Sequence, residues 1–218
     1  MLKKSLLIPI KILILKSQNS IWMTSKAFDV YRDFPFFFQE ELDEIIQAHE
    51  KVVFQKGDFI LKEGKTANEY YIIEKGLARS FVNDFNGNEV TTHFFVENEI
   101  IIEVSSLFQR IPTQENIVCI TDCECMKIDF ETFQELYHKI QNLSEWGRAW
   151  MSQELFTYKQ RSVEMFTLSA TKRYLNLLEQ KPQVVQFAPL KQIASYLGIT
   201  DTSLSRIRKE IVSHPKKN

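Results

Sequence analysis

The stretch that decides the fold lies near the C-terminus and reads Leu190-Lys-Gln-Ile-Ala-Ser-Tyr-Leu-Gly-Ile-Thr-Asp-Thr-Ser-Leu-Ser-Arg-Ile-Arg-Lys209. Its pattern predicts two short helices broken by a tight turn at Gly198, because glycine can leave a helix with positive φ at no steric cost. Ala194 supplies the small side chain that two closely crossing helices need. Thr200 or Asp201 can cap the second helix through a side-chain oxygen. Together these signals favour a helix-turn-helix.

The second of these helices is expected to have one apolar face and one polar, basic face. Leu204 and Ile207, three residues apart, give it a buried side. The other side is rich in groups that hydrogen-bond base edges and phosphates, as a helix in a major groove requires. We therefore expect DNA contacts from six residues of the two helices, namely Thr202, Ser203, Ser205, Arg206, Lys209 and Lys191. The alternative is an ordinary pair of helices with a solvated basic face.

Length, composition and charge describe a folded protein with an uneven charge distribution. The chain has 218 residues, is 44% hydrophobic and 25% charged, and can hold one large or two ordinary domains. Its net charge of −1 creates no overall attraction for nucleic acid. From Ala170 onward, however, basic residues clearly outnumber acidic ones. A basic end behind an acidic body suits phosphate binding by one module.

The cysteines and histidines do not indicate a metal centre or an enzyme. An odd set of cysteines, Cys119, Cys123 and Cys125, lies in an alternating apolar stretch, which favours buried, reduced thiols in a cytoplasm. No nearby histidine completes a tetrahedral metal site. A metal enzyme on a cupin-like roll would need several histidines lining one cavity, and only His93 lies on an expected strand. No catalytic triad, phosphate loop or carboxylate pair stands out, so we expect no enzymatic activity.

Residues 1–22 form a basic and then apolar segment that resembles the front of a signal peptide. Pro9 and Lys11 interrupt the apolar run, no small-residue cleavage site follows, and the run is too short to span a bilayer. We expect an extension ahead of a natural start at Met23, in a cytoplasmic protein without a membrane partner. The alternative is an N-terminal arm that is disordered or pairs as a strand.

The middle of the chain changes from helical spacing to alternation. Residues Pro35 to His49 have apolar positions at helical spacing and predict a helix. Between Lys51 and Asp129, short alternating runs separated by glycine-containing turns predict an antiparallel sandwich or roll and exclude a doubly wound sheet. The expected strands are Val52–Phe54, Phe59–Leu61, Tyr70–Ile73, Leu77–Val82, Val90–Val96, Ile100–Ile102, Ile117–Ile120 and Cys123–Ile128.

Helices are expected again after the strands. A short helix over Phe130–Tyr137 precedes a long one over residues 142–167, whose apolar residues form an imperfect stripe. So long a helix has little of its own domain to pack on, which favours pairing with a second copy over packing along the roll. A helix over Ala170–Gln180 and a short strand over Val184–Phe187 then lead into the helix-turn-helix. The stripe comprises Leu143, Trp146, Trp150, Phe156, Val163 and Phe166.

This order of parts, with Arg173-Tyr174 before the helix-turn-helix and glycines at 57 and 64, resembles the Crp–Fnr family of bacterial transcription regulators over roughly residues 30–212. The resemblance implies an α+β fold. An N-terminal antiparallel β-roll, a jelly roll of the cyclic-nucleotide-binding kind, would occupy residues 23–141. A long dimerisation helix would occupy 142–167, and a winged helix-turn-helix domain 168–218. Little chain remains after Val212 for a wing.

The resemblance also implies a function. Such proteins are homodimers on two-fold sites in double-stranded DNA, with RNA polymerase as a further partner. Arg206 falls where the family has a recognition-helix arginine that reads guanine. Asp201 and Thr202 replace the family's common Arg and Glu, so a different target sequence is expected. The alternative function is a small-molecule-binding roll whose helical tail contacts proteins instead of DNA.

The effector motif carries over only in part. Cyclic-nucleotide-binding members use a Gly-Glu pair for the ribose and an Arg-Ser pair for the phosphate. Here Ile102-Glu103 stands at the first pair and Thr113-Gln114 near the second, and Arg110 is the only nearby cation. Because a buried phosphate without a cation is costly, cAMP is not expected. Glu103, Thr113 and Gln114 remain the candidate effector contacts. The cysteine cluster of iron–sulfur members is absent, and no cofactor is identified.

Overall fold

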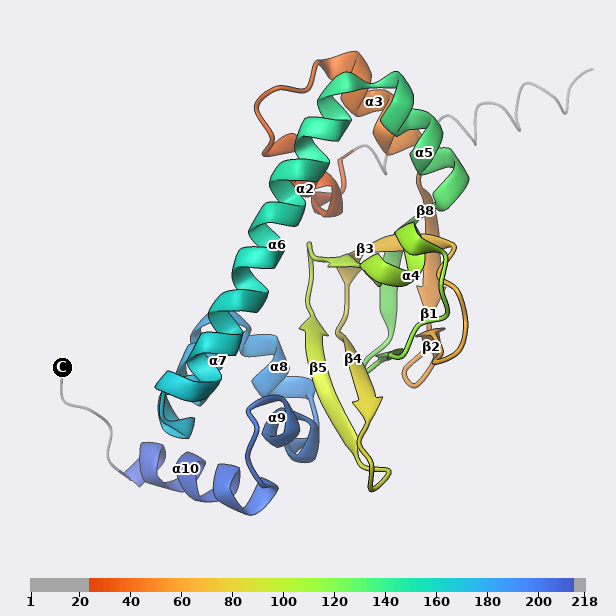
Figure 1. Cartoon of the computed structure of the whole chain (residues 1–218). Coiled ribbons are helices and arrows are strands. Elements are labelled where there is room, and N and C mark those ends of the chain that lie inside the picture. The colour runs from red at the N-terminus through yellow and green to blue at the C-terminus, as the bar shows by residue number, and fades with distance from the viewer. Residues whose placement is uncertain (1–23, 214–218) are drawn as a thin grey trace, which may run out of the picture.

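A computed structural model describes residues 24–213 and places them in a β-roll, a long helix and a helical C-terminal unit (Figure 1). The extension predicted for residues 1–22 lies outside the described residues. The helix predicted over Pro35–His49 is present as α3 (Gln39–Gln47), preceded by η1 (Lys26–Phe28) and α2 (Asp29–Arg32). Within residues 24–213, no helix is both long enough and apolar enough to cross a membrane.

The predicted antiparallel roll is confirmed. Two four-stranded sheets, ordered β1-β8-β3-β6 and β2-β7-β4-β5, contain only antiparallel neighbours. Side chains from both sheets meet between them, and the three free cysteines are buried in that layer. The strands are β1 (Glu50–Phe54), β2 (Phe59–Leu61), β3 (Glu69–Lys75), β4 (Ala78–Asn83), β5 (Glu89–Phe95), β6 (Ile100–Ile101), β7 (Asn116–Cys119) and β8 (Cys123–Asp129).

Within the roll, the sequence did not indicate α4, which lies between β6 and β7. The helices that follow the roll match the sequence prediction with one exception: the strand predicted over Val184–Phe187 is wrong because that segment is helical. Pro182 occupies the first helical turn, where its fixed φ favours a helix, and Val184 is buried against other helices. The helices are α4 (Val104–Gln109), α5 (Phe130–Lys139), α6 (Gln141–Thr167), α7 (Ala170–Gln180), α8 (Pro182–Phe187), α9 (Leu190–Tyr196) and α10 (Asp201–Ser213).

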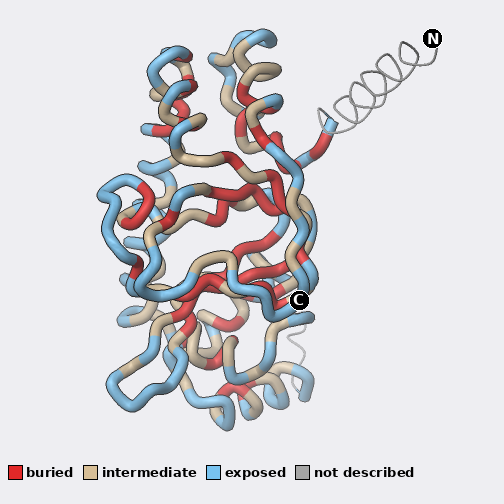
Figure 2. The backbone as a smooth tube through the Cα atoms, turned by 90° about the vertical axis from the view of Figure 1, so that its right-hand side faces the viewer, coloured by how far each residue is buried: buried red, intermediate tan, exposed pale blue. Residues whose placement is uncertain are grey.

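Two hydrophobic clusters attach the helices to the roll, and the buried segments in Figure 2 follow them. The first joins α3, α5 and the start of α6 to β3 and β8, and it includes Trp146. Trp146 stacks on Trp150 with ring centroids 6.2 Å apart, so these residues serve in packing. The second cluster joins the roll to α7–α10. The long helix therefore contacts its own chain at its beginning.

A neutral histidine lies inside the first cluster. His49 is buried; its Nδ1 is 2.8 Å from the carbonyl oxygen of Ile45, and its Nε2 is 3.3 Å from the Tyr31 hydroxyl. The Tyr31 hydroxyl is in turn 2.6 Å from that of Tyr70. This arrangement suits an imidazole that donates through Nδ1 and accepts at Nε2. Burial lowers the pKa of His49 to about 4.

The free energy of unfolding should fall as the pH drops from about 6.5 toward 4, because the unfolded chain takes up a proton at His49 before the folded chain does. His49→Gln should have a flatter pH dependence than the wild type over this window. Urea denaturation at several pH values measures this slope. His138→Gln, at an exposed position on α5, is the control and should keep the wild-type slope. Equal slopes for His49→Gln and the wild type would contradict the burial of a neutral imidazole.

Candidate nucleic-acid interface

The helix-turn-helix is formed by α9 and α10. Gly198 has φ +65° at the turn, and the backbone N–H of Ile199 donates to the carbonyl oxygen of Ala194 at 3.0 Å. Thr200 caps α10, since its Oγ1 accepts a hydrogen bond of 3.1 Å from the backbone N–H of Ser203. Ala194 is buried where the two helices cross. Each of these features follows from the local sequence.

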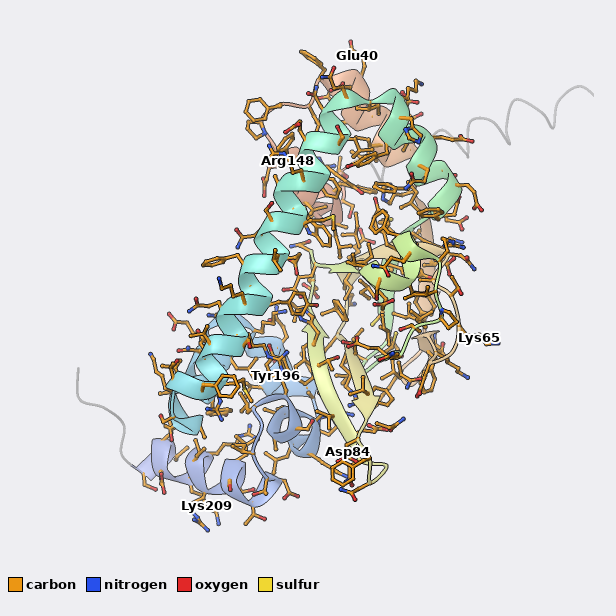
Figure 3. All side chains as sticks on the ribbon, in the orientation of Figure 1. Glu40, Lys65, Asp84, Arg148, Tyr196 and Lys209 are labelled. Atoms are coloured by element: carbon orange, nitrogen blue, oxygen red, sulfur yellow. The ribbon has the colours of Figure 1, made fainter. Side chains whose placement is uncertain are left out.

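The two faces of α10 are separated as its sequence predicts. Leu204 and Ile207 are buried against α7 and α9. Thr202, Arg206 and Lys209 are exposed, one helical turn apart on the opposite side. Within residues 24–213, the side chains of Arg206 and Lys209 have no hydrogen-bond or ion-pair partner. Figure 3 shows Lys209 pointing away from the roll at the outer edge of the molecule.

The other predicted DNA contacts lie around this face. Lys191 is exposed on α9, and Ser205 is half-buried on α10. The Ser203 hydroxyl lies 2.9 Å from Thr200 Oγ1, so it takes part in the cap of the helix. Arg208 turns inward instead, with its guanidinium carbon 6.0 Å from the Tyr174 ring centre. The surface thus carries three basic side chains, Lys191, Arg206 and Lys209, next to short hydroxyl groups.

Arg173 on α7 holds the turn of the helix-turn-helix in place. Its Nε and Nη2 donate to the carbonyl oxygen of Leu197 at 3.3 and 2.9 Å, and its Nη1 donates to that of Leu168 at 2.6 Å. A charged donor on the last carbonyl of a short helix satisfies a group that would otherwise lack a partner. The orientation of α9 is therefore tied to α7.

The C-terminal unit, α7–α10, packs on the outer face of the β2-β7-β4-β5 sheet, and we call this contact the seam. Roll residues and helical residues share one apolar cluster there. Phe94 on β5 is fully buried, and its ring lies 5.0 Å from that of Tyr196 on α9. Figure 1 shows α8 and α9 beside β5. The sequence did not predict that the two units would share a core.

Polar contacts across the seam orient the C-terminal unit on the sheet. Lys181, at the junction of α7 and α8, donates to Glu99 at 2.8 Å and to the carbonyl oxygen of Phe94 at 2.7 Å. Arg161 of α6 donates to the carbonyl oxygens of Thr92 and Tyr196. Burial, and then the positive charges of Lys181 and Arg161, hold the pKa of His93 well below its usual range. His93 therefore stays neutral in the seam.

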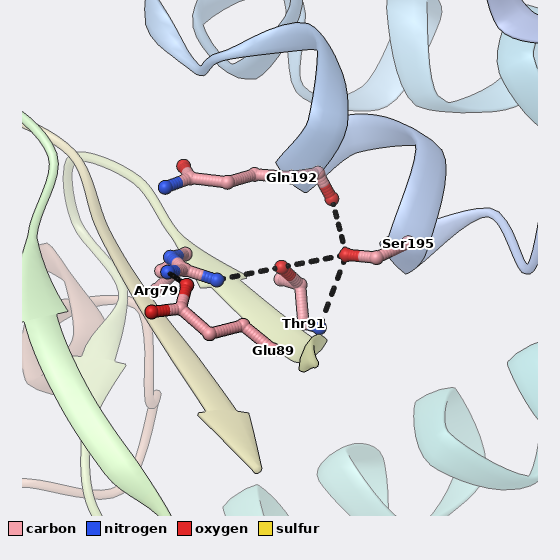
Figure 4. A network of polar contacts seen from close by, with 5 residues as sticks. All are labelled: Arg79, Glu89, Thr91, Gln192 and Ser195. Carbon is pink, nitrogen blue, oxygen red and sulfur yellow. Dashed lines mark hydrogen bonds and ion pairs between the residues drawn. The ribbon is translucent and has the colours of Figure 1, made fainter. Parts of the chain in front are cut away.

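A second set of contacts joins β5 to α9 directly. The backbone N–H of Thr91 donates to Ser195 Oγ at 3.2 Å, and the two hydroxyl groups are 3.1 Å apart. Arg79 on β4 donates to Thr91 Oγ1 at 3.0 Å and also pairs with Glu89 (Figure 4). A polar network therefore runs from the roll into the first helix of the helix-turn-helix.

The candidate effector residues occupy structural positions. Glu103 caps α4: its carboxylate accepts hydrogen bonds from the backbone N–H of Ser106 and from the Ser105 hydroxyl, both at 2.5 Å. Thr113 is buried, and its Oγ1 accepts from the backbone N–H of Glu115 at 3.0 Å. Gln114 is exposed. The cavity beside Glu103 measures about 30 Å³, which holds a water but is far below a ligand pocket.

Arg110, the cation that the sequence places closest to Glu103 and Thr113, is engaged elsewhere. Its Nη1 donates to the carbonyl oxygen of Ala67 and its Nη2 to Asn68 Oδ1, both at 2.6 Å. Its guanidinium also lies 4.8 Å from the centre of the Phe130 ring. Arg110 is therefore not free to neutralise a phosphate beside Glu103.

The long helix α6 exposes an apolar stripe that the sequence prediction placed only in part. Of the predicted stripe, Leu143 and Trp146 are buried within the chain, whereas Phe156, Val163 and Phe166 are exposed. The stripe facing solvent has spacings of four, three, four and four residues. These spacings are close to a heptad repeat, so the sequence alone could have indicated this stripe. Its apolar members are Met151, Leu155, Tyr158 and Phe166, and Ser162 occupies the remaining exposed position.

Comparisons with known proteins agree with this architecture. Residues 51–139 match the family of cyclic nucleotide-binding domains. No curated protein sequence is significantly similar to the chain. Among solved structures, FixK2 from Bradyrhizobium japonicum has a TM-score of 0.67 at 15% identity, covering 77% of this chain and 86% of FixK2.

Two further structures are similar over most of the chain. The c-di-GMP responsive regulator CLP of Xanthomonas campestris has a TM-score of 0.64 at 15% identity, covering 82% of this chain and 93% of CLP. The catabolite activator protein of Thermus thermophilus has a TM-score of 0.53 at 16% identity, covering 84% of this chain and 87% of that protein. The fold that the resemblance implies is thus confirmed.

Lys181→Met should loosen the seam without unfolding the roll, because it removes the ion pair with Glu99 and the hydrogen bond to Phe94. We expect faster amide hydrogen exchange in α8 and α9 and a loss of about 1–2 kcal/mol in the free energy of unfolding. Lys172→Met, at an exposed position on α7, is the matched control. Unchanged protection of α9 in Lys181→Met would show that the ion pair does not hold the seam.

Proposed function

We propose that this chain, which has the fold of the Crp–Fnr transcription regulators and a cyclic nucleotide-binding domain at residues 51–139, is a sequence-specific DNA-binding regulator that acts as a homodimer. The observation that carries this proposal is that α10 has one buried, apolar side and one exposed, basic side. Leu204 and Ile207 anchor one side of the helix, while the opposite side presents Arg206 and Lys209 with no partner among residues 24–213. Exposed, uncommitted basic groups on a firmly anchored helix are what a major groove requires.

In this proposal some residues contact bases and others contact phosphates. Arg206 lies nearest the middle of the exposed face and reads a base edge, since a guanidinium can bind guanine through two hydrogen bonds. Lys209 and Lys191 neutralise phosphates, while Thr202, Ser203 and Ser205 supply shorter hydrogen bonds to bases or backbone. The basic residues gather at this end of an otherwise near-neutral chain, so attraction to DNA is local.

The exposed stripe of α6 supports the homodimer. Leu155 is 70% and Phe166 88% exposed, although large apolar side chains on a single chain favour burial. A second α6 packed along this stripe would cover both, in the manner of a two-stranded coiled coil. Two-fold symmetry would place two copies of α10 on one DNA site, and such a dimer matches a palindromic sequence.

The remaining parts of the proposal concern the setting. The roll serves as a sensor domain, and no enzymatic activity is assigned to the chain. The protein works in the cytoplasm, where RNA polymerase is a further partner. The competing function is a small-molecule-binding roll whose helical tail contacts proteins. It predicts no salt-dependent retention on heparin or DNA, whereas phosphate contacts predict elution that depends steeply on salt.

Selection of bound sequences from random DNA tests the proposal and should yield a two-fold motif. On the selected site, Arg206→Ala should weaken binding by about 1–3 kcal/mol and relax the preference at one position of each half-site. Lys209→Ala should weaken binding to all sequences alike and lower the salt dependence. Fluorescence anisotropy at several salt concentrations measures both effects.

The control for these DNA measurements is Lys65→Ala, at an exposed position in a roll turn far from α10 (Figure 3). It removes one positive charge and should leave affinity and salt dependence at wild-type values. A selection that enriches no motif, or an Arg206→Ala protein with wild-type affinity, would contradict the assigned role of α10.

Leu155→Asp should convert the dimer to a monomer, because it places a charge in the centre of the proposed helix pair. Sedimentation velocity measures the mass, and circular dichroism checks that the exposed substitution leaves the fold intact. Gln153→Glu, exposed on the same helix but off the stripe, should remain dimeric. A monomeric wild-type protein at micromolar concentration would refute the dimer, while DNA binding by one copy would still be testable.

A further inference from the structure

An uncharged groove of about 450 Å³ lies where α4 and α5 meet the first half of α6. Its volume falls within the range of pockets that bind small molecules, about 300–1,000 Å³. None of the residues that line it belongs to α7–α10, and none of them also lines the cavity beside Glu103. The groove is therefore separate both from the seam and from the candidate effector residues.

Three aromatic side chains line the groove, and each is held by a ring contact with a neighbour. The Phe108 ring lies edge to face against Phe133, with the two centroids 6.3 Å apart. The Tyr137 ring contacts Phe133 as well, at 5.5 Å, and Trp150 stacks on Trp146. These walls are formed before any occupant arrives, so binding would cost little ordering of side chains.

Gly147 brings the Tyr137 ring against α6. A Cβ at this position would lie 3.2 Å from Tyr137 Cε2 and 3.6 Å from the hydroxyl oxygen, so a side chain there would displace the ring. Glycine inside a helix costs roughly 0.5–1 kcal/mol relative to alanine, and here it allows this close contact. The Tyr137 hydroxyl has no hydrogen-bond partner among residues 24–213. Because Tyr137 and Gly147 both line the groove, a free hydroxyl group lies at its surface.

The lining indicates what kind of molecule fits. No charged residue lines the groove, so an ion would lose its hydration there without gaining a partner of opposite charge. Three apolar members, Val104, Phe108 and Met151, are 36%, 38% and 44% exposed, respectively. An apolar occupant would remove that surface from water, and an aromatic one would also gain ring contacts with the walls.

A second copy of the chain suits this groove less well. The proposed helix pair runs from Met151 toward Phe166, whereas the groove extends from Met151 back to Gly147 and across to α4 and α5. In a parallel helix pair, residues at equal positions meet. A second copy would thus bring its own Arg148, whose side chain is exposed, toward a groove without any carboxylate. A small uncharged molecule avoids that mismatch.

We propose that this groove binds a small, uncharged aromatic molecule that carries one hydrogen-bond acceptor. Its rings lie among Phe108, Trp150 and Met151, and its acceptor receives a hydrogen bond from the Tyr137 hydroxyl. Binding requires neither the DNA contacts of α10 nor the pairing of α6. The site is therefore independent of the function proposed above.

Binding is tested on the full chain with N-phenyl-1-naphthylamine, an uncharged probe whose fluorescence rises in apolar surroundings. We expect saturable binding, and displacement of the probe by 2-acetylnaphthalene, which carries a carbonyl acceptor. The competitor 2-naphthoate has the same rings and a negative charge. It should displace the probe at least about tenfold more weakly, because no cation lines the groove.

Two variants test the wall and the hydroxyl separately. Val104→Phe should fill the groove and weaken probe binding at least about tenfold. Val53→Phe, also at an exposed valine but on β1 outside the groove, is the matched control and should bind like the wild type. Tyr137→Phe keeps the ring and removes the hydroxyl. It should weaken binding of 2-acetylnaphthalene about three- to tenfold and leave binding of naphthalene, which has no acceptor, unchanged.

Circular dichroism establishes that each variant is folded. The proposal would be overturned by the absence of saturable binding, by equal competition from 2-naphthoate, or by full probe binding to folded Val104→Phe. Wild-type affinity of Tyr137→Phe for 2-acetylnaphthalene would also overturn it. Probe binding to Leu155→Asp but not to the wild type would show that a second copy fills the groove, which is likewise incompatible with the proposal. No DNA is present, so none of these results depends on whether α10 reads a sequence.

Discussion

The burial of Phe94 on the outer face of the β2-β7-β4-β5 sheet is the contact on which the arrangement of this protein depends. An antiparallel sheet can leave one face in water, but only if that face is polar. Here Leu77, Phe94 and Ile120 are buried instead under α7–α10. Burying each large apolar side chain contributes about 1.5–3 kcal/mol. The roll and the helix-turn-helix therefore share one core instead of being joined only by α6.

Apolar packing alone does not determine how two surfaces are oriented, because hydrophobic contact has no direction. The polar groups of the seam provide that direction. Lys181 reaches Glu99 and a strand carbonyl, Arg161 reaches both β5 and α9, and Ser195 meets Thr91. These contacts join the roll, α6 and the C-terminal helices to one another. The orientation of α10 is thus set by hydrogen bonds made by other elements, some of them on the roll.

The roll shows how a residue that matches a motif can have a structural role instead. Glu103 agrees with the cyclic-nucleotide motif, yet its carboxylate caps α4, and the space beside it holds little more than a water molecule. Arg110 contacts backbone and side-chain oxygens of the loop around Ala67. Two spaces of about 270 and 260 Å³ lie where the roll meets α6 and the C-terminal helices.

Local sequence determined the parts of this protein whose structure is local. Alternation with glycine turns gave eight strands, helical spacing gave α3, α5, α6 and α7, and a small residue, a glycine and two apolar anchors gave α9 and α10. These features depend on neighbours within a few residues, where periodicity and capping decide the backbone. The Met151–Phe166 stripe was also readable, although burial of Leu143 and Trp146 obscured its register.

Only the tertiary structure decided how the separate elements pack against one another. The short segment Val184–Phe187, apolar except at Gln186, fits a strand or a helix equally well, and packing against α7 and α9 selected the helix. Nothing in the sequence near Arg79 or Gln192 indicates that residues more than a hundred positions apart share a groove. Such contacts depend on which surfaces meet when the chain closes. The sequence thus determined the helix-turn-helix, and the seam determined where it points.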